Sequence, residues 1–358
     1  MPKKRFMIIF FSLFLALEIV GINPVLAALP PGNAVKDPFA ILRNALPIDQ
    51  KELRELQHKL EDTSDLVRGS RWPAINKAAS SAQFLLNKRK SQIIASIPEA
   101  RVGEAEEILS SLKKNLVSLG EFASEKDKLN FINKRRESLK LIGDLESLVL
   151  NEKFPYSIPS EFDNLPRLYG RSNVSINTTK GEMQAVIDGY NAPLTAGAFI
   201  DLALKGFYDG LPINRAEEFF VLQTGDPKGP EIGYIDPDTK KERNIPLEIR
   251  VPSKKETLYN ETFEELGLYT ETPTLPFSTL GTLGWAHSNE SLDDGSSQFF
   301  FFLYEAELNP AGRNLIDGRN AAFGYVIDGA EILNELDVND KILSIKVLNG
   351  SEYLKQNA

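Results

Sequence analysis

The sequence of 358 residues predicts a multidomain α + β protein, in which an up-and-down four-helix bundle precedes a β-rich domain. Apolar residues recur at three- and four-residue spacing over residues 49–152, a pattern typical of amphipathic helices. Prolines interrupt this pattern in residues 153–172 and predict a linker. From residue 173 to residue 358, short runs of alternating polar and apolar residues, separated by glycine-containing turns, indicate strands.

The first 28 residues have the pattern of a secretory signal peptide. Lys3, Lys4 and Arg5 precede an apolar run over residues 6–20, and small residues around Ala28 suit a cleavage site. An uncleaved anchor is the alternative interpretation of the same run. No later segment reaches the roughly 20 apolar residues that span a bilayer. We therefore expect an exported protein that is soluble after signal cleavage.

Residues 29–48 contain four prolines, which break long helices, and they predict an extended arm. The following tract, residues 49–152, predicts four helices with short connections, as in an up-and-down bundle. The leucine stripes of these helices favour mutual packing over a binding function. The expected helix starts are Asp49, Trp72-Pro73, Pro98 and Ser124, and Gly120 is an expected helix end.

The domain over residues 173–358 begins with two predicted strands that turn at Lys180-Gly181. A helix is expected after Pro193. A long polar loop over residues 227–278 predicts an insertion on the surface that carries specificity. One short strand is expected within it, at residues 245–249.

Composition excludes several classes of function. The formal charge of −9 and the pI near 5.1 disfavour a nucleic-acid partner, because phosphate binding needs clustered positive charge. The chain has no cysteine and only two histidines, His58 and His287, so thiolate chemistry, histidine triads and multi-histidine metal sites are not expected. We predict neither a metal nor another cofactor.

Several motifs in the second domain follow one another in a fixed order. They are Asn191–Phe199, Lys205–Arg215, Gln223–Pro227, Gly295–Phe300, Asp317–Arg319 and Phe323–Val326. Together they resemble the cyclophilin domain over a little more than half of the chain, and the ordered set is far more specific than any single motif. The resemblance implies a closed eight-stranded β-barrel with flanking helices and peptidyl-prolyl cis-trans isomerase (rotamase) activity.

The resemblance also implies the site residues. Arg215 occupies the position of the family's catalytic arginine, and Gln223 that of the glutamine that orients it. Strand alternation over residues 219–223 would place Val221 and Gln223 on one face and Phe220 on the other. The residues implied in peptide binding are Phe220, Val221, Ala286, His287, Gln298, Phe300, Leu315, Ile316 and Asn320.

Four of these positions depart from the family's usual pattern. Methionine is usual at Val221, asparagine at His287, the indole of tryptophan at Leu315 and histidine at Asn320. Each lost pocket contact costs about 1 kcal/mol, so we expect activity lowered by one to several orders of magnitude.

A helical bundle before a diverged cyclophilin domain resembles the multidomain cyclophilins of the thylakoid lumen, whose bundle is similar to the extrinsic Q subunit of photosystem II. The resemblance implies a folding and assembly factor for photosystem II proteins, located in the thylakoid lumen or a periplasm, with proline-containing protein segments as partners. The alternative is a non-catalytic chaperone or scaffold that binds such segments. Pro155, Pro159 and Pro166 in the linker are internal candidates for the groove, and the bundle is another.

Overall fold

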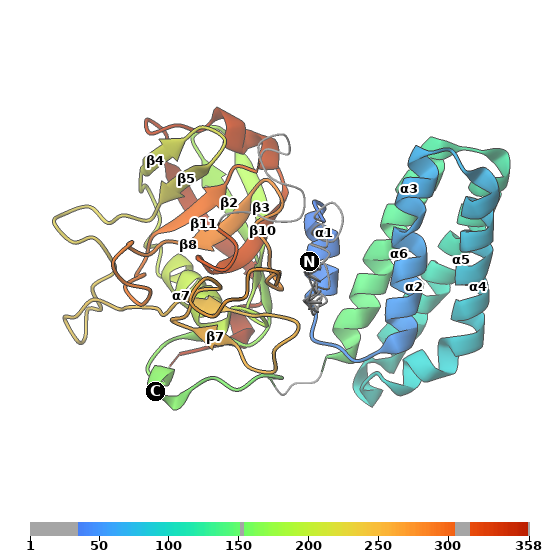
Figure 1. Ribbon diagram of the computed structural model, residues 1–358, viewed down its shortest axis with the longest axis horizontal. Helices are drawn as coiled ribbons and strands as arrows, with labels where there is room; N and C mark the ends of the chain where they lie inside the picture. Colours follow the sequence, from blue (N-terminus) through green and yellow to red (C-terminus); the bar gives the residue numbers. More distant parts are fainter. Residues whose placement is uncertain (1–34, 151–153, 305–315, 357–358) are drawn as a thin grey trace, which may run out of the picture.

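The computed structural model describes residues 35–150, 154–304 and 316–356. The signal peptide predicted for residues 1–28 lies outside the described residues. Figure 1 shows a group of long helices beside a β domain, with the short helix α1 (Pro38–Asn44) between them. None of the described helices combines the length and the apolar character that crossing a membrane requires.

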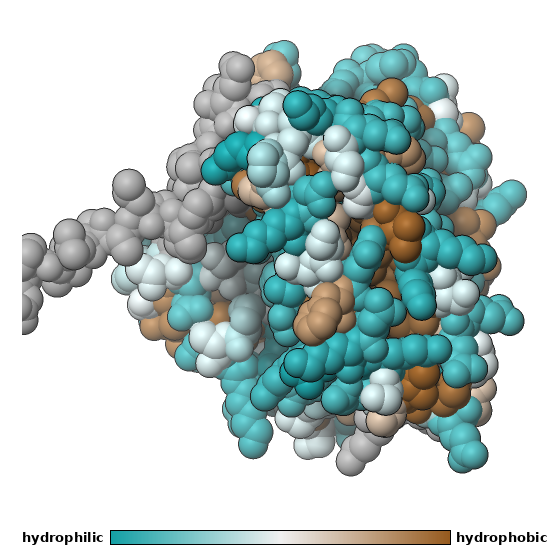
Figure 2. All heavy atoms as spheres, turned by 90° about the vertical axis from the view of Figure 1, so that its right-hand side faces the viewer, coloured by the Kyte–Doolittle hydropathy of each residue, from teal (hydrophilic) through white to brown (hydrophobic). Residues whose placement is uncertain are grey.

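The N-terminal part of the described chain is helical, and we call residues 35–150 the helical domain. After α1 its helices are α2 (Lys51–Glu61), α3 (Thr63–Arg68), α4 (Trp72–Ala95), α5 (Val102–Glu125) and α6 (Lys128–Val149). α2 packs on α4 and α6, and α5 packs on the same two helices. Their shared core is mostly aliphatic, as the leucine stripes predict. The outward face is mainly hydrophilic, with separate hydrophobic patches (Figure 2).

The boundary between α5 and α6 differs from the prediction. α5 continues through Gly120 to Glu125 and ends where Lys126 adopts a left-handed conformation, at φ 61°. The cap of α6 is Asp127, whose carboxylate accepts a hydrogen bond from the backbone of Asn130 (3.1 Å). The predicted cap, Ser124, lies inside α5. Periodicity locates a helix to within a few residues. The first residue then depends on which nearby side chain accepts a hydrogen bond from the free backbone N–H groups.

The prediction of an extended arm over residues 29–48 is wrong for residues 38–44, which form α1. Asp37 caps this helix, and Pro38 occupies its first turn, where no backbone N–H is required. Ile41 and Leu42 are buried in the core of the β domain. The start of α2 also moves by one residue, because Gln50 rather than Asp49 caps it.

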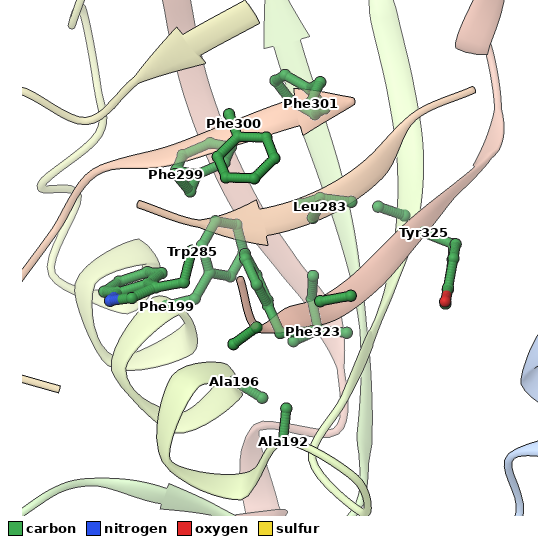
Figure 3. Packing of buried hydrophobic residues seen from close by; sticks show 14 of the residues in the cluster. Ala192, Ala196, Phe199, Leu283, Trp285, Phe299, Phe300, Phe301, Phe323 and Tyr325 are labelled. Atoms are coloured by element: carbon green, nitrogen blue, oxygen red, sulfur yellow. The ribbon is translucent and has the colours of Figure 1, made fainter. Parts of the chain in front are cut away.

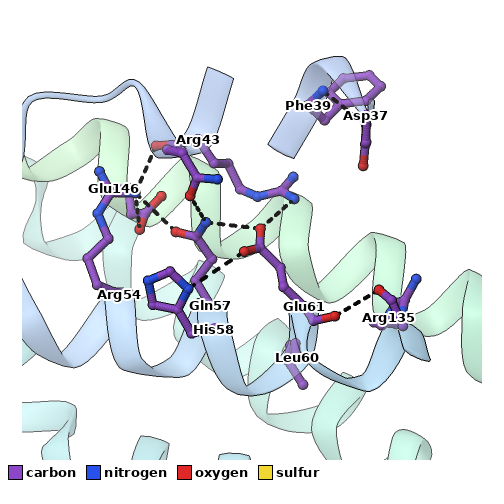
Figure 4. Close-up of polar contacts among 12 residues, drawn as sticks. Asp37, Phe39, Arg43, Arg54, Gln57, His58, Leu60, Glu61, Arg135 and Glu146 are labelled. Carbon is purple, nitrogen blue, oxygen red and sulfur yellow. Dashed lines mark hydrogen bonds and ion pairs between the residues drawn. The ribbon is translucent and has the colours of Figure 1, made fainter. Parts of the chain in front are cut away.

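Polar contacts connect α1 to the other helices of the helical domain (Figure 4). Arg54 of α2 donates hydrogen bonds to the carbonyl groups of Arg43 (2.8 Å) and Leu46 (2.7 Å), at the end of α1. Arg43 forms an ion pair with Glu61 of α2 at 3.1 Å. Glu146 of α6 is fully buried and lies 3.3 Å from Arg54. Burial outweighs this nearby charge and raises the pKa of Glu146 to about 7.

The β domain contains one eight-stranded antiparallel sheet in the order β11-β2-β3-β10-β8-β9-β5-β4. The strands are β2 (Arg171–Thr178), β3 (Glu182–Asp188), β4 (Ile213–Glu217), β5 (Val221–Thr224), β8 (Thr282–Trp285), β9 (Phe299–Phe302), β10 (Ala322–Asp328) and β11 (Ile342–Asn349). Two short ribbons pair β1 (Arg167–Leu168) with β12 (Leu354–Lys355) and β6 (Glu248–Ile249) with β7 (Leu258–Tyr259). The helix α7 (Pro193–Leu204) follows β3.

The prediction of a closed barrel is wrong, because the sheet is an open, curled half-barrel. Its edge strands β4 and β11 meet near their first residues, where backbone hydrogen bonds from Ile213 to Asp340 (3.0 Å) and from Ile342 to Leu211 (2.9 Å) flank a bridge between Pro212 and Lys341, but the two strands are not paired along their lengths. Beyond Ile213, β4 is exposed to solvent.

Aromatic rings fill both sides of β9, because successive strand residues point to opposite faces. Phe299 packs against Phe199 of α7 (5.1 Å between ring centroids), inside the core shown in Figure 3. Phe300 stacks on Phe277 from the other side (5.7 Å). The strand under the predicted site is therefore held from both faces.

The insertion over residues 227–278 is a surface excursion only in its first part, since most of residues 228–243 are exposed and the later part is anchored in the core. Ile245, Leu247, Val251, Phe263 and Phe277 are buried in the core of the β domain. The strand β6 lies within the expected segment 245–249 but has only two residues. The polar composition of the segment hid these apolar anchors, which are too widely spaced to show a period.

Candidate active site

Neighbouring strands place three predicted site residues in one row. Arg215 on β4 pairs with Gln223 on β5, and Gln223 pairs with Phe300 on β9. Residues paired across antiparallel strands project from the same face, so their side chains are neighbours. Gly284 on β8 continues the row and leaves room for the Phe300 ring, since a Cβ atom there would lie 2.3 Å from that ring.

This row lies along a groove of about 560 Å³. Nine of the predicted site residues line the groove: Arg215, Phe220, Val221, Gln223, Ala286, His287, Phe300, Ile316 and Asn320. Gln298 lines an adjoining pocket of about 360 Å³, which shares Gln223, Ala286 and His287 with the groove. Leu315, the remaining predicted residue, lies outside the described residues.

A chain of amide contacts determines which atom Gln223 presents to Arg215. The carbonyl of Ile232 can only accept, so the Gln298 amide must turn its Nε2 toward it (2.9 Å). Gln298 Oε1 then faces Gln223 and accepts from its Nε2 at 2.7 Å. The oxygen of Gln223 is left pointing toward Nη1 of Arg215, at 3.5 Å. An acceptor is therefore the group that orients the guanidinium.

The turn between β4 and β5 brings Phe220 into the groove. The backbone N–H of Phe220 donates to the carbonyl of Glu217 (3.0 Å), and Phe219 adopts φ 60° between them. Because β5 begins only at Val221, the predicted alternation does not reach Phe220. This residue lines the groove together with Val221 and lies under the Arg215 guanidinium, 5.9 Å from ring centroid to Cζ. The prediction that Phe220 faces the opposite side is thus wrong.

His287 and Asn320 contact the backbone around the groove. The two ring nitrogens of His287 lie 2.7 Å from the carbonyl oxygen of Ser288 and 2.9 Å from that of Arg319. Asn320 donates from Nδ2 to the carbonyl of Trp285 (3.3 Å). Both side chains therefore connect segments that are far apart in the sequence.

Sequence reasoning missed the part of the groove that the insertion supplies. Thr262 and Glu264 line this part, and Glu264 forms an ion pair with Arg319 at 2.6 Å. Phe263 anchors the segment, since its N–H donates to the carbonyl of Gly318 (2.9 Å) and its ring occupies the place of a Gly318 side chain. Ser288, Asn289 and Leu292 complete the described lining. A lone phenylalanine in a polar segment was the only signal for this wall.

The described part of the linker packs on the β domain away from the groove. Phe154 stacks on Tyr169 (4.6 Å), which follows β1 within the predicted linker, and the Arg250 guanidinium of the β domain lies over the Tyr156 ring (4.0 Å). Phe162 contacts Tyr259 (5.1 Å). Of the described residues that line the groove, none comes from the linker or the helical domain.

The curled antiparallel sheet, with an arginine held by oriented amides over a groove that contains Phe220 and Phe300, defines a prolyl isomerase of the cyclophilin class. Residues 173–348 match the model of the cyclophilin type peptidyl-prolyl cis-trans isomerases. Residues 37–150 match the PsbQ-like domain of CYP38-like peptidyl-prolyl cis-trans isomerases. That match begins at α1, which supports assigning α1 to the helical domain.

Two relatives cover almost all of the chain. A putative thylakoid lumen peptidyl-prolyl cis-trans isomerase of Synechocystis is 48% identical over 330 residues, which are 92% of this chain and 87% of the relative. The chloroplastic peptidyl-prolyl cis-trans isomerase CYP38 of Arabidopsis thaliana is 40% identical over 346 residues, 93% of this chain and 79% of the relative. The chain belongs to the cyclophilin-type peptidyl-prolyl cis-trans isomerases, in the group whose members carry a PsbQ-like domain.

Proposed function

We propose that isomerisation takes place in the 560 Å³ groove, with Arg215 as the catalytic residue and Gln223 as the residue that positions it. The observation that carries this assignment is the row formed by the guanidinium, the oriented amide of Gln223 and the Phe300 ring. The residues that bind the substrate proline and its neighbours are Phe220, Val221, Ala286, His287, Gln298, Phe300, Leu315, Ile316 and Asn320.

The chemistry follows from the barrier to rotation. A prolyl bond rotates over about 18–20 kcal/mol, because the planar amide is conjugated. Twisting the bond localises a lone pair on the prolyl nitrogen, and a donor that cannot deprotonate stabilises that state more than either planar state. The Arg215 guanidinium is such a donor. The reaction needs no nucleophile and no proton transfer.

We also propose that the activity is weak. Val221 is smaller than the methionine that the family usually has, so it covers less of the proline ring. Asn320 directs its amide to the carbonyl of Trp285 and offers no ring face to the groove. Each difference removes contact area and leaves the guanidinium in place.

In the cell we propose that the protein is a folding and assembly factor for photosystem II proteins in the thylakoid lumen, exported by its N-terminal segment. The support is the PsbQ-like match over residues 37–150 and the two relatives named as thylakoid lumen and chloroplastic isomerases. The four long helices would then form the up-and-down bundle predicted from their periodicity. Binding assays with proline-containing lumenal segments of photosystem II subunits test the client class, and equal binding to scrambled segments would contradict it.

Replacing Arg215 tests the catalytic assignment. Arg215→Ala is expected to lower kcat/KM for a short prolyl peptide by about 10²–10³-fold, the cost of removing one preorganised donor. Arg319→Ala is the matched control, because it removes another exposed guanidinium from the same groove. The control should lose far less activity, and both variants should keep the wild-type melting temperature. Equal losses in the two variants would show that kcat/KM depends on the overall positive charge of the groove and not on Arg215 in particular.

One observation favours a non-catalytic chaperone as the second candidate. The Asn320 amide donates to the backbone carbonyl of Trp285 and is not available to hold a substrate. The groove therefore has fewer contacts for stabilising a twisted prolyl bond, although it can still bind an extended peptide. A folded protein that binds proline peptides with no rate above background, and whose binding is lost with Phe300→Ala, would support this alternative.

A further inference from the structure

The catalytic arginine of this chain has an acidic partner on its own strand. Glu217 follows Arg215 by two residues on β4, so the two side chains project from the same face. Nε and Nη2 of Arg215 both lie 2.7 Å from Oε1 of Glu217. Both side chains are about half exposed, at 46% and 50%. One edge of the guanidinium is therefore already engaged by the protein itself.

The hairpin turn keeps Glu217 in this position. Glu217 pairs with Val221 across the hairpin, and its carbonyl accepts from Phe220 to close the turn. Phe219, between them, has φ 60°, a left-handed conformation that costs a non-glycine residue about 1–2 kcal/mol. A turn that tolerates this cost is specified by its surroundings, so the backbone of Glu217 stays beside that of Arg215 on β4.

The contact reduces what Arg215 can offer to a substrate. A guanidinium has five N–H donors, and Glu217 occupies the edge formed by Nε and Nη2 while Gln223 lies near Nη1. The negative carboxylate also lowers the positive potential with which the guanidinium stabilises the developing lone pair. The residues that bind the planar peptide are the pocket walls, and Glu217 does not change them. Both effects therefore weaken stabilisation of the twisted state more than binding of the planar peptide.

We propose that Glu217 is a positioning residue that holds the Arg215 guanidinium against β4 and slows isomerisation. This inference rests on the proposed catalytic role of Arg215. Loss of the contact frees this edge of the guanidinium and should raise kcat. KM should change little, because the planar substrate does not need that edge in order to bind. Screening by salt weakens an exposed pair, so salt should raise the wild-type rate as well.

The test uses the full-length protein and a short prolyl peptide. Glu217→Gln is expected to raise kcat about two- to fivefold with KM little changed, the range that an exposed ion pair supports. Glu218→Gln is the matched control, since it removes the same charge from the next, exposed residue of the turn, and it should leave kcat unchanged. Added salt should raise the rate of the wild type and leave that of Glu217→Gln nearly constant.

A double variant separates this proposal from the proposed function. In the Arg215→Ala background, Glu217→Gln should have no effect, because the contact is already absent. If Arg215→Ala abolishes activity but Glu217→Gln leaves kcat unchanged or lowers it, the role given to Glu217 is wrong and that of Arg215 stands. An equal rise in Glu218→Gln would also overturn the proposal, since the effect would then be one of general charge. If Arg215→Ala retains full activity, both assignments fail.

Discussion

The helical domain and the β domain differ in how their cores relate to their surfaces. The buried core of the helical domain is aliphatic apart from Phe131, and the described part of this domain does not contribute to the groove. In the β domain, Phe299 faces the core while its neighbour Phe300 lines the groove. One strand of the β domain therefore carries both core residues and groove residues, whereas the described core of the helical domain has no neighbour in the groove. We therefore expect a substitution in the core to disturb the groove only when it is made in the β domain.

The largest expected effect tests this separation directly. Phe131→Ala and Phe299→Ala each empty a fully buried ring position and should lower the free energy of unfolding by about 3–5 kcal/mol. Only Phe299→Ala should also lower the kcat/KM of the folded protein, because its strand carries Phe300. Denaturant titration and peptide isomerisation well below the unfolding transition measure the two quantities. A loss of kcat/KM in Phe131→Ala as large as that in Phe299→Ala would show that the two cores are coupled.

The buried carboxylates of the two domains give the next effect. Glu146 in the helical domain lies near Arg54, although its oxygens have no hydrogen-bond partner among the described residues. Glu248 in the β domain accepts a hydrogen bond from the N–H of Thr195, at the start of α7 (2.7 Å). Burial raises the pKa of Glu146 from 4.5 to about 7 and that of Glu248 from 4.5 to about 8.

The sign of the pH dependence follows from these values. Between pH 4.5 and 7 the folded protein keeps a proton on Glu146 that the unfolded chain has released, so the free energy of unfolding falls as the pH rises. Glu146→Gln should remove this loss and, at about 1.4 kcal/mol per pKa unit, stabilise the protein by roughly 3 kcal/mol at pH 8 and by little at pH 4.5. Unfolding titrations across this pH range measure the difference.

Glu248→Gln is the control for this prediction, because the same substitution in the β domain retains an oxygen for Thr195. Its stabilising effect should continue to grow up to about pH 8, one unit beyond that of Glu146→Gln. A stability difference between wild type and Glu146→Gln that is independent of pH would show that Glu146 titrates near its ordinary pKa.

The smallest expected effect concerns one strained residue in each domain. Phe219 in the β4–β5 turn and Lys126 at the end of α5 both have left-handed backbones, with φ 60° and 61°. Glycine should be more stable than alanine at each position by about 1 kcal/mol, because alanine keeps the Cβ clash that glycine lacks. Melting temperatures of the two Gly and Ala pairs measure this difference. Alanine being the more stable residue at position 219 would mean that the turn relaxes.

The sequence predicted which residues line one groove better than it predicted the fold around them. Arg215, Gln223 and Phe300 were found because short ordered motifs carry them, and strand pairing then brought them together. Glu217 was missed, although alternation along β4 places it on the face of Arg215, because the motif that resembles the family ends at Arg215. Glu264 was missed because its segment appeared to be a surface loop.

By itself the sequence determined the periodic helices and the strands near residues 173–187, since each depends on neighbours within one helix turn or one strand. Its resemblance to the cyclophilin domain implied nine of the residues that line the groove. The tertiary structure decided that the sheet stays open between β4 and β11, that Pro38 starts a helix which joins two domains, and that the insertion builds a wall of the groove. These features depend on pairing and packing between segments far apart in the sequence, such as α1 and β10, for which no local pattern exists.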